Sequence, residues 1–286
     1  MYLTHIIDDF NFEDFVETDE VLYTLKFEQI KIKIVFPFFK SKVLFHNNQG
    51  RNCSLLWSHT LHGTVKNYIF RVENIVEFYW DKGSNVIKYK YLKYADKKLV
   101  HYWLLHTFLP LYYTLENVYE ILHVGAVAIN EKVCLFAAPS FGGKSTLTHY
   151  FLEKGHQLFS DDKLALFKRD NVYFAAPSYP YVRNYRKYEN LGEFRRNFSE
   201  KSLVVGCIYK LIQVAEDDEI KIEEVRGVHK FSIIEMSSDI KLSFLKKEKF
   251  SHLHDLAENL TIYTITIPQN LNRLEEVYKK IIEHTL

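Results

Sequence analysis

The chain is poor in the residues that mark several specialised protein classes. It has three cysteines, six prolines and ten glycines among its 286 residues. Cys53, Cys134 and Cys207 are odd in number and form no C-x-x-C pair, which argues against a disulfide framework or a zinc site. The scarcity of proline and glycine argues against a low-complexity chain. These absences favour an ordinary globular protein in a reducing, cytoplasmic setting.

An excess of charge is also missing. The 37 Lys and Arg residues nearly balance 36 Asp and Glu residues, and no basic block stands out, so we expect no nucleic acid partner. The N-terminus has no signal-peptide pattern, because Met1–His5 soon meets Asp8 and Asp9.

The longest uncharged stretch, Leu99–Leu115, contains no Lys, Arg, Asp or Glu. A membrane span is one interpretation. The stretch is, however, shorter than the roughly 20 residues that a span needs, and it carries two His and a Pro. We therefore expect no membrane span, and a buried helix pair interrupted at Pro110.

The most informative segment that is present is Ala138–Thr146, which reads A-P-S-F-G-G-K-S-T. This is the pattern of a phosphate-binding P-loop, with Ala in place of the first Gly. Glycines allow the backbone to approach phosphates closely, the lysine brings a cation to them, and the following serine can ligate Mg²⁺. The residues expected to hold the nucleotide are Ser140, Phe141, Gly142, Gly143, Lys144, Ser145 and Thr146.

The context of this segment fits a P-loop. Val133–Ala137 is a short apolar run that predicts a strand, and Thr146–Lys154 predicts a helix that ends before Gly155. A Gly-Gly turn in front of an amphipathic helix is the alternative. The order strand, glycine loop, helix favours the P-loop.

A pair of acids follows one helix later. Gln157–Ser160 predicts a strand that ends at Asp161 and Asp162. Two adjacent carboxylates repel each other, and Mg²⁺ would relieve that repulsion. Phosphoryl transfer needs acids of this kind to hold the metal and to deprotonate or orient the attacking hydroxyl. An Asp-Asp turn at a sheet edge is the alternative.

Three segments in this order resemble the HPr kinase/phosphorylase-related family. They are Leu122–Val127, which carries His123, then the glycine loop, and then Gly155–Asp162. The resemblance covers residues 97–286, and more loosely the region before them. It implies an α/β or α+β fold, in which a P-loop core shared with phosphoenolpyruvate carboxykinase and built on a mixed β-sheet follows a small β-rich N-terminal domain.

The resemblance also implies a chemistry, with ATP and Mg²⁺ as cofactors. By matched position, His123 would line the site, Asp161 would act as the base, and Asp162 would join Ser145 on Mg²⁺. A buried core histidine is the alternative for His123. Arg183, in a segment that resembles one branch of the family, could contact phosphate or lie on the surface.

One motif of HPr kinases proper is missing after the acid pair. Pro177–Arg183 occupies its place, and Glu224–Gly227 spells E-x-R-G too late in the chain, so we treat that match as chance. HPr as the acceptor, and the phosphorylase reaction, are therefore not implied.

We expect two domains, a β-rich recognition or docking domain over residues 1–97 and a kinase-like domain over 98–286. Alternation over Ile30–Phe36 and further apolar runs predict the strands of the first. Its His59-x-x-His62 pair lacks a third ligand and predicts structural histidines.

The function expected is ATP-dependent phosphorylation of a hydroxyl, typically of serine, on a peptide, a protein or a small metabolite. HPr kinases are hexamers, so the resemblance also suggests that the chain forms a homo-oligomer. A nucleotide-binding regulatory or scaffold protein without turnover, and a simple NTPase, are the alternatives.

Overall fold

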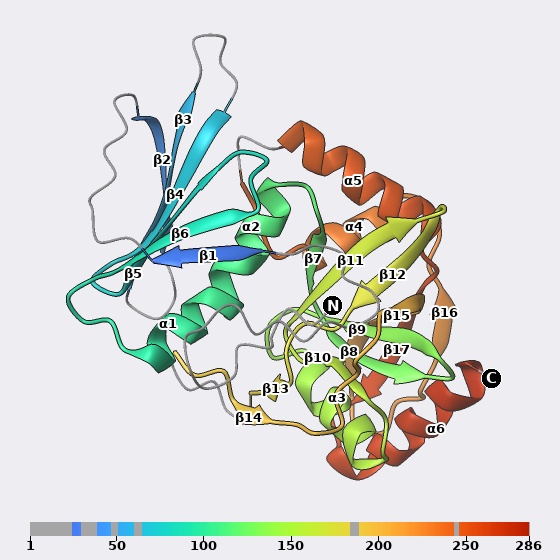
Figure 1. Cartoon of the computed structure of the whole chain (residues 1–286). Coiled ribbons are helices and arrows are strands. Elements are labelled where there is room, and N and C mark those ends of the chain that lie inside the picture. The colour runs from blue at the N-terminus through green and yellow to red at the C-terminus, as the bar shows by residue number, and fades with distance from the viewer. Residues whose placement is uncertain are drawn as a thin grey trace. The chain divides into compact units, whose positions relative to one another are not determined.

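The structure is a computed structural model, and it describes residues 25–29, 39–46, 51–59, 65–183, 189–242 and 246–285. The chain divides into two compact units. The first takes in the described residues of Thr4–Glu116 together with Tyr185–Leu191, and the second those of Asn117–Asn184 and Gly192–Leu286. Figure 1 labels the helices and strands of both units.

The first unit contains a six-stranded sheet in the order β1-β6-β5-β4-β3-β2. β1 runs parallel to β6, and the other neighbours are antiparallel. The strands are β1 (Lys26–Gln29), β2 (Phe39–His46), β3 (Asn52–His59), β4 (Val65–Val72), β5 (Val76–Asp81) and β6 (Val86–Tyr91). The further apolar runs that predict strands, at residues 41–45, 68–72, 75–79 and 86–91, each overlap an observed strand. The expected strand at Ile30–Phe36 and His62 of the histidine pair lie outside the described residues.

A helical stretch packs on this sheet through stacked aromatic rings. It comprises α1 (Lys97–Trp103), a π-helical turn η1 (Leu104–Phe108) and α2 (Leu109–Leu115). Phe108 stacks on Phe78 with ring centroids 4.1 Å apart. Asp96 caps the N-terminus by accepting a hydrogen bond from the Lys98 backbone N–H at 3.0 Å.

The expected break at Pro110 is not observed, and the helix pair is one helical run. Pro110 lies in the first turn of α2, where a backbone N–H is not required. The π turn before it bonds the Leu109 N–H to the Leu104 carbonyl, so the helix continues through the proline. In the described part of the chain, no helix is both long enough and apolar enough to cross a membrane.

The second unit is a mixed α/β structure around a nine-stranded sheet. Its main path is β10-β8-β9-β15-β12-β11-β7, with β17 beside β15 and β16 beside β17. β15 runs parallel to both β9 and β17, whereas the other pairs are antiparallel. The strands are β7 (Glu120–His123), β8 (Gly125–Ile129), β9 (Lys132–Ala137), β10 (Leu158–Ser160), β11 (Lys163–Arg169), β12 (Val172–Ala176), β15 (Leu203–Val214), β16 (Ile222–Glu224) and β17 (Ile262–Pro268), and a separate pair comprises β13 (Tyr181–Val182) and β14 (Glu193–Phe194).

Helices cover both faces of this sheet (Figure 1). Phe151 of α3 (Lys144–Glu153) and Ile281 of α6 (Leu274–Thr285) share one hydrophobic cluster with Phe136 of β9. On the other face, residues of α4 (Val228–Ser237) and α5 (Lys246–Asn259) share a cluster with Leu135. Neighbours on β9 point to opposite faces, as strand geometry requires. A 3₁₀ turn, η3 (Leu271–Arg273), precedes α6.

The boundary between the compact units differs from the expected one at residue 97. The helical run over 97–115 belongs to the first unit because its aromatic side chains pack on that sheet. Glu189 also belongs to this unit, although it follows the acid pair in sequence. Its carboxylate pairs with Arg51 and accepts a hydrogen bond from the Trp103 indole N–H at 2.8 Å.

Candidate active site

The glycine loop, residues 138–143, joins β9 to α3 and leaves its backbone in conformations suited to small residues. Gly143 has φ 91°, and Phe141 has φ 65° although it is not glycine. A Cβ on Gly142 would lie 2.6 Å from the Ala138 Cβ, so a larger residue there would push the loop open. Ser140, Phe141 and Thr146 are exposed. The loop therefore presents an accessible backbone at the N-terminus of a helix, where anions bind readily.

Lys144 folds back over this loop. Its ammonium donates hydrogen bonds to the carbonyls of Ala138 at 2.7 Å and Pro139 at 3.2 Å, and the residue is 6% exposed. A buried ammonium held by these neutral carbonyls keeps its positive charge near the loop. The arrangement suits a cation that attracts phosphate.

Asp161 lies directly after β10 and is 4% exposed. Its Oδ2 accepts a hydrogen bond from the Arg183 backbone N–H at 3.1 Å. Burial, and to a smaller extent the charge on Asp162, raise the pKa of this carboxyl to about 6, while hydrogen bonds from the Arg183 backbone N–H and the Ser145 side chain oppose the shift. Asp161 therefore lies within reach of Ser145, and its proton affinity is high for a carboxyl.

Asp162 faces a different set of partners. Its Oδ1 lies 2.7 Å from His123 Nδ1, and its Oδ2 lies 3.5 Å from Arg183 Nη1. The His123 side chain is 29% exposed, against 15% for Asp162. Pairing of β11 with β7 sets this contact, because Lys163 lies opposite His123 in the ladder. A carboxylate on one ring nitrogen orients an imidazole whose other nitrogen can exchange a proton.

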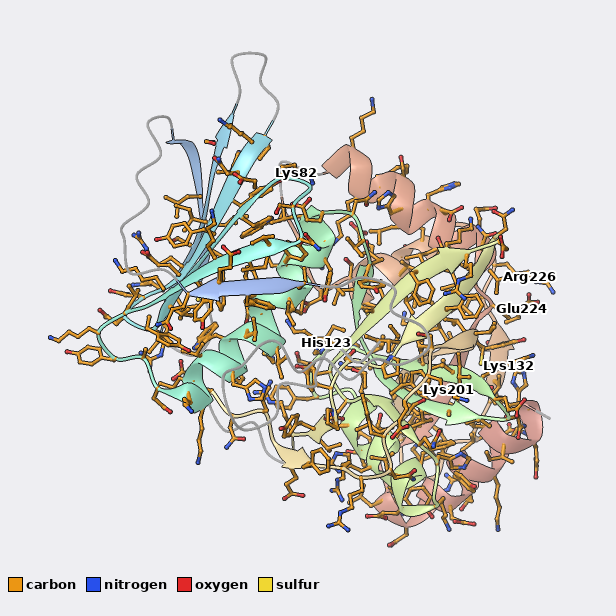
Figure 2. The ribbon with its side chains drawn as sticks, viewed as in Figure 1. Lys82, His123, Lys132, Lys201, Glu224 and Arg226 are labelled. Atoms are coloured by element: carbon orange, nitrogen blue, oxygen red, sulfur yellow. The ribbon has the colours of Figure 1, made fainter. Side chains whose placement is uncertain are left out.

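The structure thus brings together the side chains singled out from three separate stretches of sequence. Asp161 and Asp162 contact Ser145, His123 and Arg183 between them. Glu224–Gly227 does not join this group. Glu224 pairs with Arg226 at 2.6 Å, and both are labelled well away from His123 in Figure 2.

Two residues of this site escaped the sequence analysis. His149 Nε2 lies 4.0 Å from Asp161 Oδ1. Gly125 allows β8 to approach α3, since a Cβ there would lie 2.1 Å from the Thr148 hydroxyl. The helical spacing of His149 from Ser145 was the available sequence signal for His149. No sequence pattern identified Gly125.

The donor set suits a hard cation. A hydroxyl and two carboxylates are the oxygen ligands that Mg²⁺ prefers. Among the described residues, no group of three His, Cys, Asp or Glu side chains is placed to hold a metal. The protein ligands expected here, Ser145 and one acid, would therefore need phosphate oxygens or water to complete the coordination.

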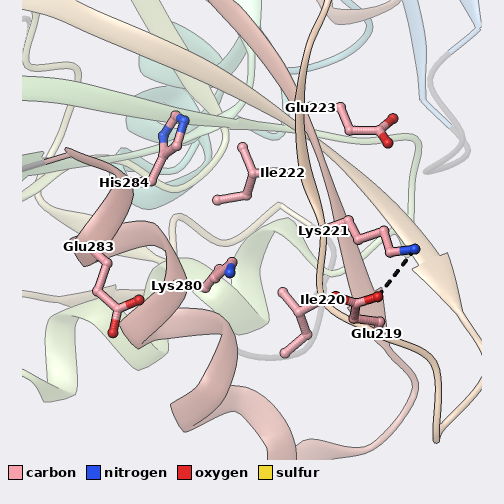
Figure 3. A pocket seen from close by; sticks show the side chains of 8 residues that line it. All are labelled: Glu219, Ile220, Lys221, Ile222, Glu223, Lys280, Glu283 and His284. Atoms are coloured by element: carbon pink, nitrogen blue, oxygen red, sulfur yellow. Dashed lines mark ion pairs between the residues drawn. The ribbon is translucent and has the colours of Figure 1, made fainter.

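Two concave cavities of the second unit lie apart from this group. One, of about 540 Å³, is bounded by Ile222 of β16 and Lys280 of α6, and Figure 3 shows its mixed lining of acids, lysines and a histidine. The other, of about 520 Å³, lies between Phe231 of α4 and Phe250 of α5. Neither is lined by residues of the glycine loop. A phosphate cradle made of backbone N–H groups does not need a deep cavity.

Comparison with protein-family models finds no match, and comparison with curated proteins finds none either. Among solved structures, the chain is similar to the Hpr(Ser) kinase/phosphatase from Coxiella burnetii, at 14% sequence identity. The match covers 58% of this chain and 95% of that one, with a TM-score of 0.37. A likeness at this level assigns no activity to the chain.

Proposed function

We propose that the chain is an ATP-dependent phosphotransferase that moves the γ-phosphoryl group to a hydroxyl acceptor. The observation that carries the proposal is that Asp161 lies beside α3, the helix that starts at the loop lysine, with its Oδ1 4.0 Å from His149 Nε2. In-line phosphoryl transfer needs a cradle, a cation and acids at one place. The glycine loop, Lys144 and the two aspartates supply these parts.

The acceptor would be a hydroxyl of a peptide, a protein or a small metabolite, with serine as the expected case. In the transfer, the acceptor oxygen forms a bond to the γ-phosphorus as the bond to the β,γ-bridging oxygen breaks, leaving ADP. The hydroxyl proton passes to a base of the protein. Mg²⁺ would neutralise the charge on the phosphates.

The contacts favour roles for the two aspartates that differ from the roles that the resemblance implies. Geometry comes before pKa in choosing a base, because the base must reach the hydroxyl. Asp161 is more buried than Asp162 and sits against Ser145. We therefore propose Asp161 with Ser145 on the metal side, and the His123–Asp162 pair on the acceptor side as the base. The raised pKa of Asp161 supports the other assignment, with Asp161 as base.

Substitution separates the two assignments. If Asp161 is on the metal side, Asp161→Asn raises the Mg²⁺ concentration needed for half-maximal nucleotide binding, and Asp162→Asn leaves it unchanged but lowers turnover. If Asp162 is the metal ligand, the two variants exchange these effects. Equal loss of Mg²⁺ affinity in both would mean that both aspartates are ligands, with His123 left as the first candidate base.

The test of the function itself is a calorimetric titration of the full chain with ATP, with and without Mg²⁺. Lys144→Ala should weaken binding while thermal unfolding is preserved. Lys132→Ala is the matched control, since Lys132 is an exposed lysine on the strand that feeds the loop. Unchanged affinity in Lys144→Ala would remove the assignment of the loop.

Turnover distinguishes the alternatives. A phosphotransferase labels an acceptor from γ-³²P-ATP, whereas an NTPase releases phosphate without one, and a scaffold binds nucleotide without either product. The first unit carries no catalytic residue of this proposal, and we propose that its sheet contributes to recognising or docking the acceptor.

A further inference from the structure

Two buried polar atoms face each other where α3 meets the end of β10. His149 Nε2 lies 4.0 Å from Asp161 Oδ1. Within the described chain, no group makes a hydrogen bond with either atom. Buried polar atoms in folded proteins are nearly always hydrogen-bonded, so a facing pair of exceptions points to a contact that forms at another stage.

His149 lies on α3, the helix that follows the glycine loop. Ser145 and His149 are four residues apart on α3, so their side chains lie on the same face of the helix. Asp161 uses Oδ2 for the Arg183 backbone N–H. Its Oδ1 is thereby left toward His149.

The imidazole has a proton to donate. A neutral imidazole carries one N–H. The separation is about 1 Å longer than a hydrogen bond, and site contacts commonly tighten when substrate binds.

We infer that His149 is a positioning residue, whose Nε2–H donates to Asp161 Oδ1 when nucleotide binds and holds that carboxylate beside Ser145. The inference rests on the proposed function. Carboxylates at metal sites are themselves held by hydrogen bonds from neighbouring groups, and loss of such a group weakens metal affinity by about 10- to 100-fold.

The first test is Mg²⁺-dependent binding of a fluorescent ADP analogue to the full chain. His149→Leu should raise the Mg²⁺ concentration for half-maximal binding by about 10-fold. His149→Gln, which keeps an N–H donor at a similar reach, should restore most of the loss. His229→Leu, at an exposed helical histidine on α4, is the matched control. An unchanged Mg²⁺ requirement in His149→Leu, or equal losses in the Leu and Gln variants, would overturn the inference.

The second test does not depend on nucleotide chemistry. Ring-nitrogen NMR of the ¹⁵N-labelled chain, with the His149 signal identified by its absence in His149→Gln, reports the surroundings of Nε2. Asp161→Asn should move this signal and leave that of His229 in place. An unmoved His149 signal overturns the inference whatever the chain binds. If Asp161→Asn moves the His149 signal but the wild-type chain binds no nucleotide, the contact between the two side chains is supported and the proposed function is rejected.

Discussion

Glu77 of the first unit and Asp161 of the second are both buried acids, with exposed fractions of 5% and 4%. Glu77 is fully partnered, because Arg71 donates to one carboxylate oxygen and the Tyr79 hydroxyl donates to the other. Asp161 has a partner on Oδ2, but none of the described residues donates to Oδ1. Burial alone therefore does not identify a functional acid. The distinguishing feature of Asp161 is an oxygen that the fold leaves unsatisfied.

The largest expected effect is on turnover, and measuring it tests whether Asp161 and Glu77 differ in function. Asp161→Asn should lower the rate of phosphoryl transfer by roughly 10²- to 10⁴-fold, whether the residue is the base or the metal-side acid. Glu77→Gln should leave the rate unchanged. The measurement is single-turnover phosphorylation of the acceptor with both variants. If Glu77→Gln lost as much activity as Asp161→Asn, the distinction between the two acids would not hold.

Stability should change in the opposite direction from activity at Asp161. Its folded pKa of about 6 lies above the ordinary 3.8. Between these two pH values the folded chain binds more protons than the unfolded chain, so its stability falls as pH rises from about 4 to about 6. The full cost, about 3 kcal/mol, is present above that range.

Asp161→Asn removes this cost because the amide stays neutral. Without Mg²⁺ at pH 7.5, the variant should unfold at a higher denaturant concentration than the wild type, and near pH 4 the difference should vanish. Urea titrations at both pH values check this prediction. A variant that is less stable at pH 7.5 would show that the carboxylate is held more favourably than its burial implies.

The sequence was sufficient for those parts of the candidate site that depend on neighbours along the chain. The order of strand, glycine loop and helix, and the acids at the end of the next strand, are local features, and the structure contains these elements. The contact between His123 and Asp162 was not predicted, since it depends on the register of β7 against β11, and the resemblance implied only that His123 would line the site.

Other features depend on tertiary packing and could not be predicted. Pro110 was expected to break a helix, but a π turn before it supplies the needed backbone geometry. The helical spacing of His149 from Ser145 was not enough to predict its place, because a histidine on a helix faces the site only if the helix is rotated correctly. The membership of Glu189 in the first unit depends on a long-range contact with Arg51 that no local pattern encodes.

Lys144→Ala should weaken binding of Mg²⁺–ATP by roughly 10- to 100-fold, since a charge-assisted hydrogen bond contributes about 1.5–3 kcal/mol. The fold should survive because the ammonium bonds loop carbonyls, and the carbonyl of the exposed Pro139 can bond to water in its place. Calorimetry with Lys132→Ala alongside gives the comparison. Equal weakening in both variants would indicate a general effect of positive charge and not a site at the loop.

The smallest expected effect is on stability, and it concerns Glu77 of the first unit. Glu77→Gln keeps the shape of the side chain but replaces one carboxylate oxygen with an amide that cannot accept a hydrogen bond. Either the Arg71 guanidinium or the Tyr79 hydroxyl then loses its acceptor, at a cost of about 1–2 kcal/mol. The control is Glu73→Gln. Glu73 is an exposed acid on the adjacent turn, and it accepts a hydrogen bond from the Asn52 side chain at 2.8 Å. This change should alter stability by less than about 0.5 kcal/mol. Urea unfolding of the three chains at pH 7.5 measures these differences. A Glu77→Gln chain as stable as the control would mean that its carboxylate is not structural, and Glu77 would then need a functional explanation of the kind proposed for Asp161.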